Sequence, residues 1–152
     1  MSKYTFRNFT DEETENHKIS GCEQWIFSGE EYEQYALFFG KLIMLFGIND
    51  SAENEYIMYS YRITAENEDG KKFYFEIYQQ DEFDGPTISC GMSSEYEQVA
   101  RKLIEFIESA EPADYVHEWK NLRSSPFCTD DIVYTVKNGV ADVRRNTVKG
   151  YN

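Results

Sequence analysis

One segment of the chain, residues 28–47, repeats apolar residues every three or four positions. This is the period of a helix that buries one face. Ser28 and Glu31 at its start have the spacing of a capping box, in which side chains satisfy the first backbone amides. Gly47 stands where the left-handed residue after a helix is needed. We therefore predict an amphipathic helix over this segment.

A second segment, residues 94–110, has the same period. Ser94 and Glu97 again have the spacing of a capping box, and Pro112 follows shortly after the last apolar position. These signals predict a second amphipathic helix.

Most of the remaining chain alternates apolar and polar residues, which is the pattern of half-buried strands. The predicted strands cover residues 4–9, 19–27, 55–63, 73–79, 87–90, 114–119, 132–136 and 140–144. Asp69-Gly70 and Asn138-Gly139 are strong signals for tight hairpin turns. The polar run 10–18 reads as a loop, and residues 146–152 read as a frayed C-terminus. The pattern predicts a single α+β domain over residues 1–152, an antiparallel sheet built from hairpins with two amphipathic helices packed on it.

Composition and charge narrow the classes of protein that the chain can belong to. With 152 residues, 41% hydrophobic content, 12 Tyr and 11 Phe, the chain has enough apolar surface for one core and is not disordered. The formal net charge is −13, so the protein repels phosphate backbones and anionic lipid. We expect neither nucleic acid nor membrane as a partner. The negative charge lies in residues 1–100, because residues 101–152 hold equal numbers of acidic and basic side chains.

The sequence also favours a cytoplasmic location. Its N-terminus lacks the apolar core of a signal peptide, and the longest apolar run, residues 35–46, is too short to cross a bilayer. Cys22, Cys90 and Cys128 are odd in number and far apart, which favours reduced, buried thiols over a disulfide framework or a zinc site.

No arrangement of residues in the sequence identifies a catalytic site, a metal site or a cofactor, and we predict that the protein is not an enzyme. The glycines are scattered, and the only histidines are His17 and His117. A nucleophilic pair of Cys90 and His117 is conceivable, but a buried thiol and a strand histidine are both commonplace. Residues 81–85 crowd carboxylates in a turn, yet Met92 stands where a calcium loop needs glutamate.

The second face of the predicted hairpin at 55–79 carries more aromatic side chains than a sheet face that contacts only solvent. We therefore expect helices, a partner or a ligand to cover it. Acidic loops beside tyrosine-rich strands suit an inhibitor of a basic protein, since carboxylates speed the encounter and buried aromatics hold the complex. The predicted partner-binding residues are Glu53, Glu55, Tyr56, Met58, Glu66, Glu68, Asp69, Tyr74, Tyr78, Asp81, Glu82 and Asp84.

The central region also resembles a known class of protein. The run YIMYSYRITAENEDGKKFYFEIYQ, the turn DGPTISCG, the capped helix SSEYEQVARKLIEFIESA and the motif EPADY are similar to immunity proteins of bacterial polymorphic toxin and contact-dependent growth inhibition systems. The resemblance implies a cytoplasmic, non-catalytic protein that binds and occludes the C-terminal domain of one cognate toxin. Many such toxins are basic nucleases. No contact residues carry over, because immunity proteins place their contacts differently from group to group.

Two other hypotheses stay open. One is a small-ligand-binding or enzymatic α+β domain with a pocket over the tyrosine-rich sheet face. The other is a structural module that buries these aromatics in a symmetric dimer. For the inhibitor we expect a monomer or a weak homodimer.

Overall fold

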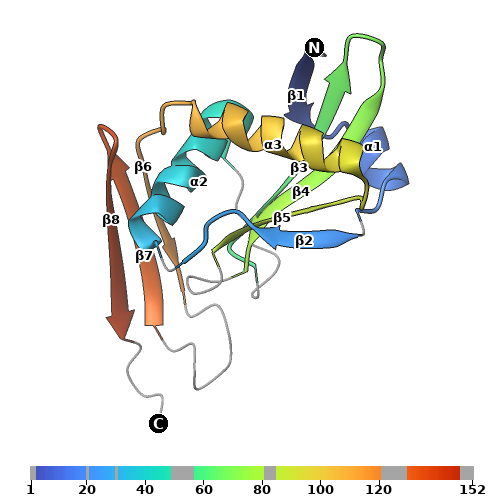
Figure 1. Ribbon diagram of the computed structural model, residues 1–152. Helices are drawn as coiled ribbons and strands as arrows, with labels where there is room; N and C mark the ends of the chain where they lie inside the picture. Colours follow the sequence, from blue (N-terminus) through green and yellow to red (C-terminus); the bar gives the residue numbers. More distant parts are fainter. Residues whose placement is uncertain are drawn as a thin grey trace.

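Eight strands and three helices make up the part of the chain that the computed structural model describes, which is residues 3–19, 21–29, 31–48, 57–80, 85–120 and 130–147 (Figure 1). In chain order they are β1 (Tyr4–Asn8), α1 (Asp11–Asn16), β2 (Cys22–Trp25), α2 (Tyr32–Phe46), β3 (Tyr59–Asn67), β4 (Lys72–Gln79), β5 (Pro86–Cys90), α3 (Ser94–Glu108), β6 (Tyr115–Trp119), β7 (Asp130–Lys137) and β8 (Val140–Thr147). The strands form two antiparallel sheets, one with the order β1-β3-β4-β5-β2 and one with the order β6-β7-β8. The predicted α+β class is confirmed.

Both predicted hairpin turns are present. In the β3–β4 turn the Asn67 side chain accepts hydrogen bonds from the backbone amides of Asp69, at 3.0 Å, and Lys71, at 2.9 Å. In the β7–β8 turn Asn138 and Gly139 both have positive φ, as a two-residue turn of this kind requires. Local turn chemistry therefore sets the register of both hairpins.

The two long helices form where their apolar period predicts, but each begins at a different residue. The N-cap of α2 is Glu31, which makes no side-chain cap hydrogen bond, so the predicted start at Ser28 is wrong. The end is as predicted, because the Gly47 amide bonds the carbonyl of Ile43. In α3 the capping side chain is Ser93 rather than the predicted Ser94.

The prediction of a loop over residues 10–18 is wrong, because this segment contains α1. Thr10 and Glu13 form a complete capping box, in which each side chain accepts a hydrogen bond from the other residue's backbone amide. The helix has no apolar residue and therefore no hydrophobic period that would reveal it. It lies on the opposite face of the five-stranded sheet from α3, so the helices do not all share one face (Figure 1).

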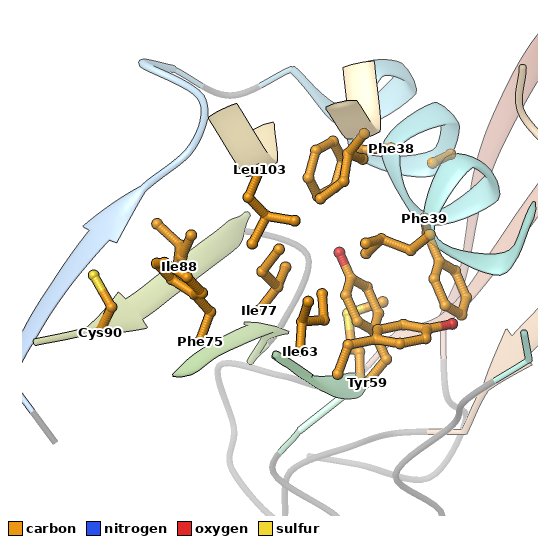
Figure 2. Close-up of a cluster of buried hydrophobic side chains, with 14 of the residues drawn as sticks. Phe38, Phe39, Tyr59, Ile63, Phe75, Ile77, Ile88, Cys90 and Leu103 are labelled. Atoms are coloured by element: carbon orange, nitrogen blue, oxygen red, sulfur yellow. The ribbon is translucent and has the colours of Figure 1, made fainter. Parts of the chain in front are cut away.

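The core lies between the five-stranded sheet and the two long helices. Ile63, Phe75 and Ile77 point from the sheet toward Phe38 of α2 and Leu103 of α3, and all five are at most 2% exposed (Figure 2). Burying a side chain of this size stabilises the fold by about 1.5–3 kcal/mol. The sheet face that turns toward these helices is therefore filled.

The three-stranded sheet packs against the other side of α2 (Figure 1). Hydrogen bonds tie it to the rest of the fold, among them one that the Gln79 side-chain amide of β4 donates to the Tyr134 hydroxyl of β7 at 3.0 Å. The Trp119 indole N–H donates to the Met58 carbonyl at 2.9 Å, and the Tyr115 hydroxyl donates to the Ala36 carbonyl at 2.7 Å. Buried residues of both sheets belong to one continuous hydrophobic cluster.

Candidate functional site

The five-stranded sheet has a second face, opposite α2 and α3, which we call the open sheet face. Strand alternation and register place one set of side chains on it. These are Thr5 and Arg7 of β1, Glu23 and Trp25 of β2, Ser60, Arg62, Thr64 and Glu66 of β3, Lys72, Tyr74, Glu76 and Tyr78 of β4, and Thr87 and Ser89 of β5. This is the aromatic face of the hairpin that the sequence indicates must be covered.

One half of the open sheet face is covered by α1 and the residues beside it. The His17 ring stacks on Tyr74 with centroids 4.0 Å apart, and Phe9 meets the same tyrosine edge-on at 5.6 Å. Burial raises the pKa of the Tyr74 hydroxyl. Around Tyr74 the cover is therefore part of the chain itself.

A partly buried ion pair fixes α1 to the sheet. Glu13 is 7% exposed, and its carboxylate accepts hydrogen bonds from Arg7 at 2.6 Å and from the Thr64 hydroxyl at 3.0 Å. The Thr10 amide donates to the same carboxylate at 2.9 Å. The hydrogen bond from Arg7, with those from Thr10 and Thr64, lowers the pKa of Glu13 from its ordinary value of 4.5 to about 2, against the opposing effect of burial.

This low pKa predicts how stability depends on pH. A carboxyl whose pKa is depressed by folding stabilises the protein above its unfolded pKa, and this contribution is lost as the pH falls from 4.5 toward 2. In urea titrations we expect Glu13→Gln to lower the free energy of unfolding by about 2 kcal/mol at about pH 6, and by less than half as much at about pH 3. Equal losses at both pH values would contradict this role.

The second half of the open sheet face has no described helix over it. Trp25, Thr87, Tyr78 and Ser60 are consecutive register partners and form a row across four strands. Trp25 is 72% exposed. A hollow of about 430 Å³ lies around this row, lined by Glu23, Trp25, Tyr78, Gln80 and Thr87. Tryptophan and tyrosine are the side chains that protein interfaces favour.

A second hollow of about 510 Å³ begins on the other side of Ser60 and runs to the end of α2. Its lining includes Arg62, Phe9 and Ile48, and Ile48 is 81% exposed. Between the hollows, Glu76 accepts a hydrogen bond from Ser60 at 2.9 Å and lies 3.6 Å from Arg62. The surface thus has a polar centre and an exposed apolar residue toward each end.

The helix that borders this surface is strongly acidic. Four of the six residues of α1 are Asp11, Glu12, Glu13 and Glu15, and none of the six is basic. Glu13 is neutralised by Arg7, whereas the other three carboxylates are exposed. The open sheet face therefore combines exposed apolar groups with a negative border.

The structure brings together only part of the predicted site. Glu66, Tyr74 and Tyr78 lie on the open sheet face, where Glu66 is 3.7 Å from Arg7. Glu66 lies at the opposite end of the hairpin from Tyr78, next to Glu68 and Asp69 of the turn. Residues Glu53, Glu55, Tyr56, Asp81, Glu82 and Asp84 lie outside the described residues.

The assignment of Met58 to the site is wrong. Met58 is fully buried, because Trp119 packs over the start of β3 and bonds its carbonyl. The sequence prediction missed Trp25 and Ile48. The alternating segment 19–27 carried the signal for Trp25, since it places the tryptophan and Glu23 on one face.

The conceivable pairing of Cys90 with His117 does not occur. Cys90 is on β5, whereas His117 is on β6 of the other sheet, with its ring 4.3 Å from that of Trp119. Within the described ranges, no group of three or more His, Cys, Asp or Glu side chains is placed to hold a metal ion. None of the helices that the structure describes is long and apolar enough to span a membrane.

Comparison of the chain with protein-family models, curated proteins and solved structures finds no match. The fold and the site themselves define the class, which is an α+β protein with two antiparallel sheets and a half-covered sheet face. The functional inference therefore rests on the residues of that face.

Proposed function

We propose that this protein is an immunity protein that acts in the cytoplasm, where it binds and occludes the basic C-terminal domain of a cognate toxin. The observation that carries the proposal is the row through Trp25 and Tyr78, which presents a largely exposed tryptophan on a sheet face next to the acidic helix α1. The resemblance of the central region to immunity proteins supports the same function.

The chemistry of the surface suits this role. Interface hot spots are enriched in tryptophan and tyrosine, because these rings remove a large apolar area from water at little cost in entropy. The exposed carboxylates of α1 and the net charge of −13 attract a positively charged partner and speed its encounter. An active site that binds nucleic acid would offer such a partner surface, and covering it would block the toxin.

Coexpression with the toxin domain encoded by the neighbouring reading frame tests the proposal. We expect the two proteins to purify as one complex, and cells that express the toxin domain to grow only when this protein is present. The association rate should fall steeply as salt is added, since the attraction is electrostatic. Absence of a complex together with absence of growth rescue would contradict the proposal.

The hollow beside Trp25 favours a second candidate function, the binding of a small ligand. Its volume of about 430 Å³ lies within the usual range of small-molecule sites. Native mass spectrometry of the protein purified from its own host separates the two functions. A bound small molecule would add a defined mass that disappears in Trp25→Ala, whereas the immunity function predicts an unliganded mass and a complex with the toxin domain.

A further inference from the structure

Two of the three cysteines, which are far apart in the sequence, become direct neighbours in the fold. Cys22 of β2 and Cys90 of β5 are register partners in an antiparallel pair. Side chains of such partners point to the same face, with Cβ atoms about 4.5–5.5 Å apart. Both cysteines are free thiols in this structure. They are reduced here, as the sequence favours, but their wide spacing in the sequence does not reveal that the two are neighbours.

The geometry of the strands brings this pair close to that of a disulfide. The Ile26 amide donates a hydrogen bond to the Pro86 carbonyl at 3.0 Å. Hydrogen-bonded and non-hydrogen-bonded pairs alternate along an antiparallel ladder, so Cys22 and Cys90, four residues further along each strand, also form a hydrogen-bonded pair. Such partners have Cα atoms about 5.5 Å apart, which is within the usual range for disulfides. The Cβ atoms of a hydrogen-bonded pair lie near the wide end of the cross-strand range, so they must close by about 1 Å or more to reach the separation in a disulfide. The pair sits at the end of an edge strand, where the backbone has room to make this shift.

The backbones are in tight contact beside the two cysteines. Gly21 has a φ of +138°, and a Cβ atom there would lie 2.3 Å from the Cys90 carbonyl oxygen. Only glycine fits this position, and its small size lets β2 approach β5 closely next to Cys22. The close approach of the two thiols is therefore built into the chain.

The pair is accessible from solvent. Both cysteines line a hollow of about 390 Å³ between the edge of the sheet and α3, together with Met92 and Arg101. Cys22 is half-buried, whereas Cys90 is 9% exposed, and burial raises the pKa of the Cys90 thiol. Cys22 is thus the thiol that a reagent from solvent meets first.

We propose that Cys22 and Cys90 form a modification site, at which a small disulfide oxidant such as oxidised glutathione converts them into a reversible intrachain disulfide. The Cys22 thiolate attacks one sulfur of the oxidant, so that its S–S bond breaks and one glutathione thiolate leaves. Cys90 then loses its proton to solvent and attacks the Cys22 sulfur, which expels the second glutathione. The protein loses two electrons, and one oxidised glutathione becomes two reduced molecules.

The disulfide would join β2, which is an edge strand four residues long, covalently to β5. It would constrain the unfolded chain by joining residues far apart in sequence, which raises the melting temperature by about 5–10 °C for a protein of this size. Amide hydrogen exchange in β2 should slow in the oxidised protein. These effects do not depend on the proposed toxin-binding function.

The test uses the Cys128→Ser variant, in which only Cys22 and Cys90 remain, incubated with oxidised glutathione. We expect the intact mass to fall by two hydrogen atoms, both thiols to resist iodoacetamide after unfolding, and reduced glutathione to reverse the change. In the same background, Cys22→Ser and Cys90→Ser serve as controls and should accept one glutathione at most. If Cys128→Ser does not fold, peptide mapping of the oxidised wild-type protein gives the same answer.

Three results would contradict the proposed disulfide. A variant that keeps both thiols alkylatable after incubation with oxidised glutathione overturns the proposal. So does one that carries glutathione on both cysteines, because the intrachain step would then not take place. In the wild-type protein, a disulfide that joins Cys128 to either cysteine in place of the Cys22–Cys90 bond would also overturn it.

Discussion

Replacement of Phe39 by Ala should lower the free energy of unfolding by about 3–5 kcal/mol, a large fraction of the stability of a single domain. Phe39 is 1% exposed on α2, between the two sheets. Its ring stacks on Tyr59 with centroids 4.4 Å apart and planes 1° apart, and it also contacts Trp119 at 5.6 Å. The substitution leaves a cavity where both sheets meet the helix, and few neighbours there can move to fill it.

The matched control is Tyr59→Phe, which keeps the stacked ring and removes only its hydroxyl. That hydroxyl is buried without a hydrogen-bond partner among the described residues, so its removal should change stability by less than about 1 kcal/mol. Urea unfolding followed by circular dichroism measures both variants. A loss of less than about 1 kcal/mol for Phe39→Ala would show that the two sheets do not share one tightly packed core.

The parts of the fold that depend on local signals were predictable from the sequence. Gly70, Asn138 and Gly139 all take a positive φ, which few other residues adopt readily, so the Asp69-Gly70 and Asn138-Gly139 pairs located both hairpins. The apolar period located α2 and α3, although their exact first residues depend on which side chain reaches a backbone amide.

The pairing of distant strands was not predictable in this way. β1 pairs with β3, and β2 pairs with β5, through contacts between segments far apart in the chain. Such partners are selected by the packing of the whole core, which no local pattern records. The division into two sheets has the same cause, and it is the reason that Met58 is buried under Trp119 rather than exposed.

The candidate site depends on these distant pairings more than the fold class does. Trp25 reaches the row with Tyr78 only because β2 adds to the sheet beyond β5. Cys22 meets Cys90 for the same reason. The helix α1 covers Tyr74 because the Glu13 carboxylate accepts hydrogen bonds from Arg7 of β1 and Thr64 of β3.

Replacement of Trp25 by Ala should weaken the complex with the cognate toxin domain about 30-fold or more, equivalent to at least about 2 kcal/mol. Trp25 stands at the end of the row through Tyr78 and is 72% exposed in the free protein. Because so much of its surface is in water, the fold itself should lose little stability when it is removed, whereas an interface that covers it would lose a large apolar contact. Isothermal titration calorimetry with the purified toxin domain measures the change in affinity.

A control variant must remove an equally exposed apolar side chain from a different surface. Val116 on β6 is 71% exposed and lies on the three-stranded sheet, away from the open sheet face. Val116→Ala should bind the toxin domain as tightly as the wild-type protein does. If both variants bind as the wild type does while the complex still forms, the toxin contacts another surface, and the exposed tryptophan needs a different explanation, such as the small ligand that the adjoining hollow could hold.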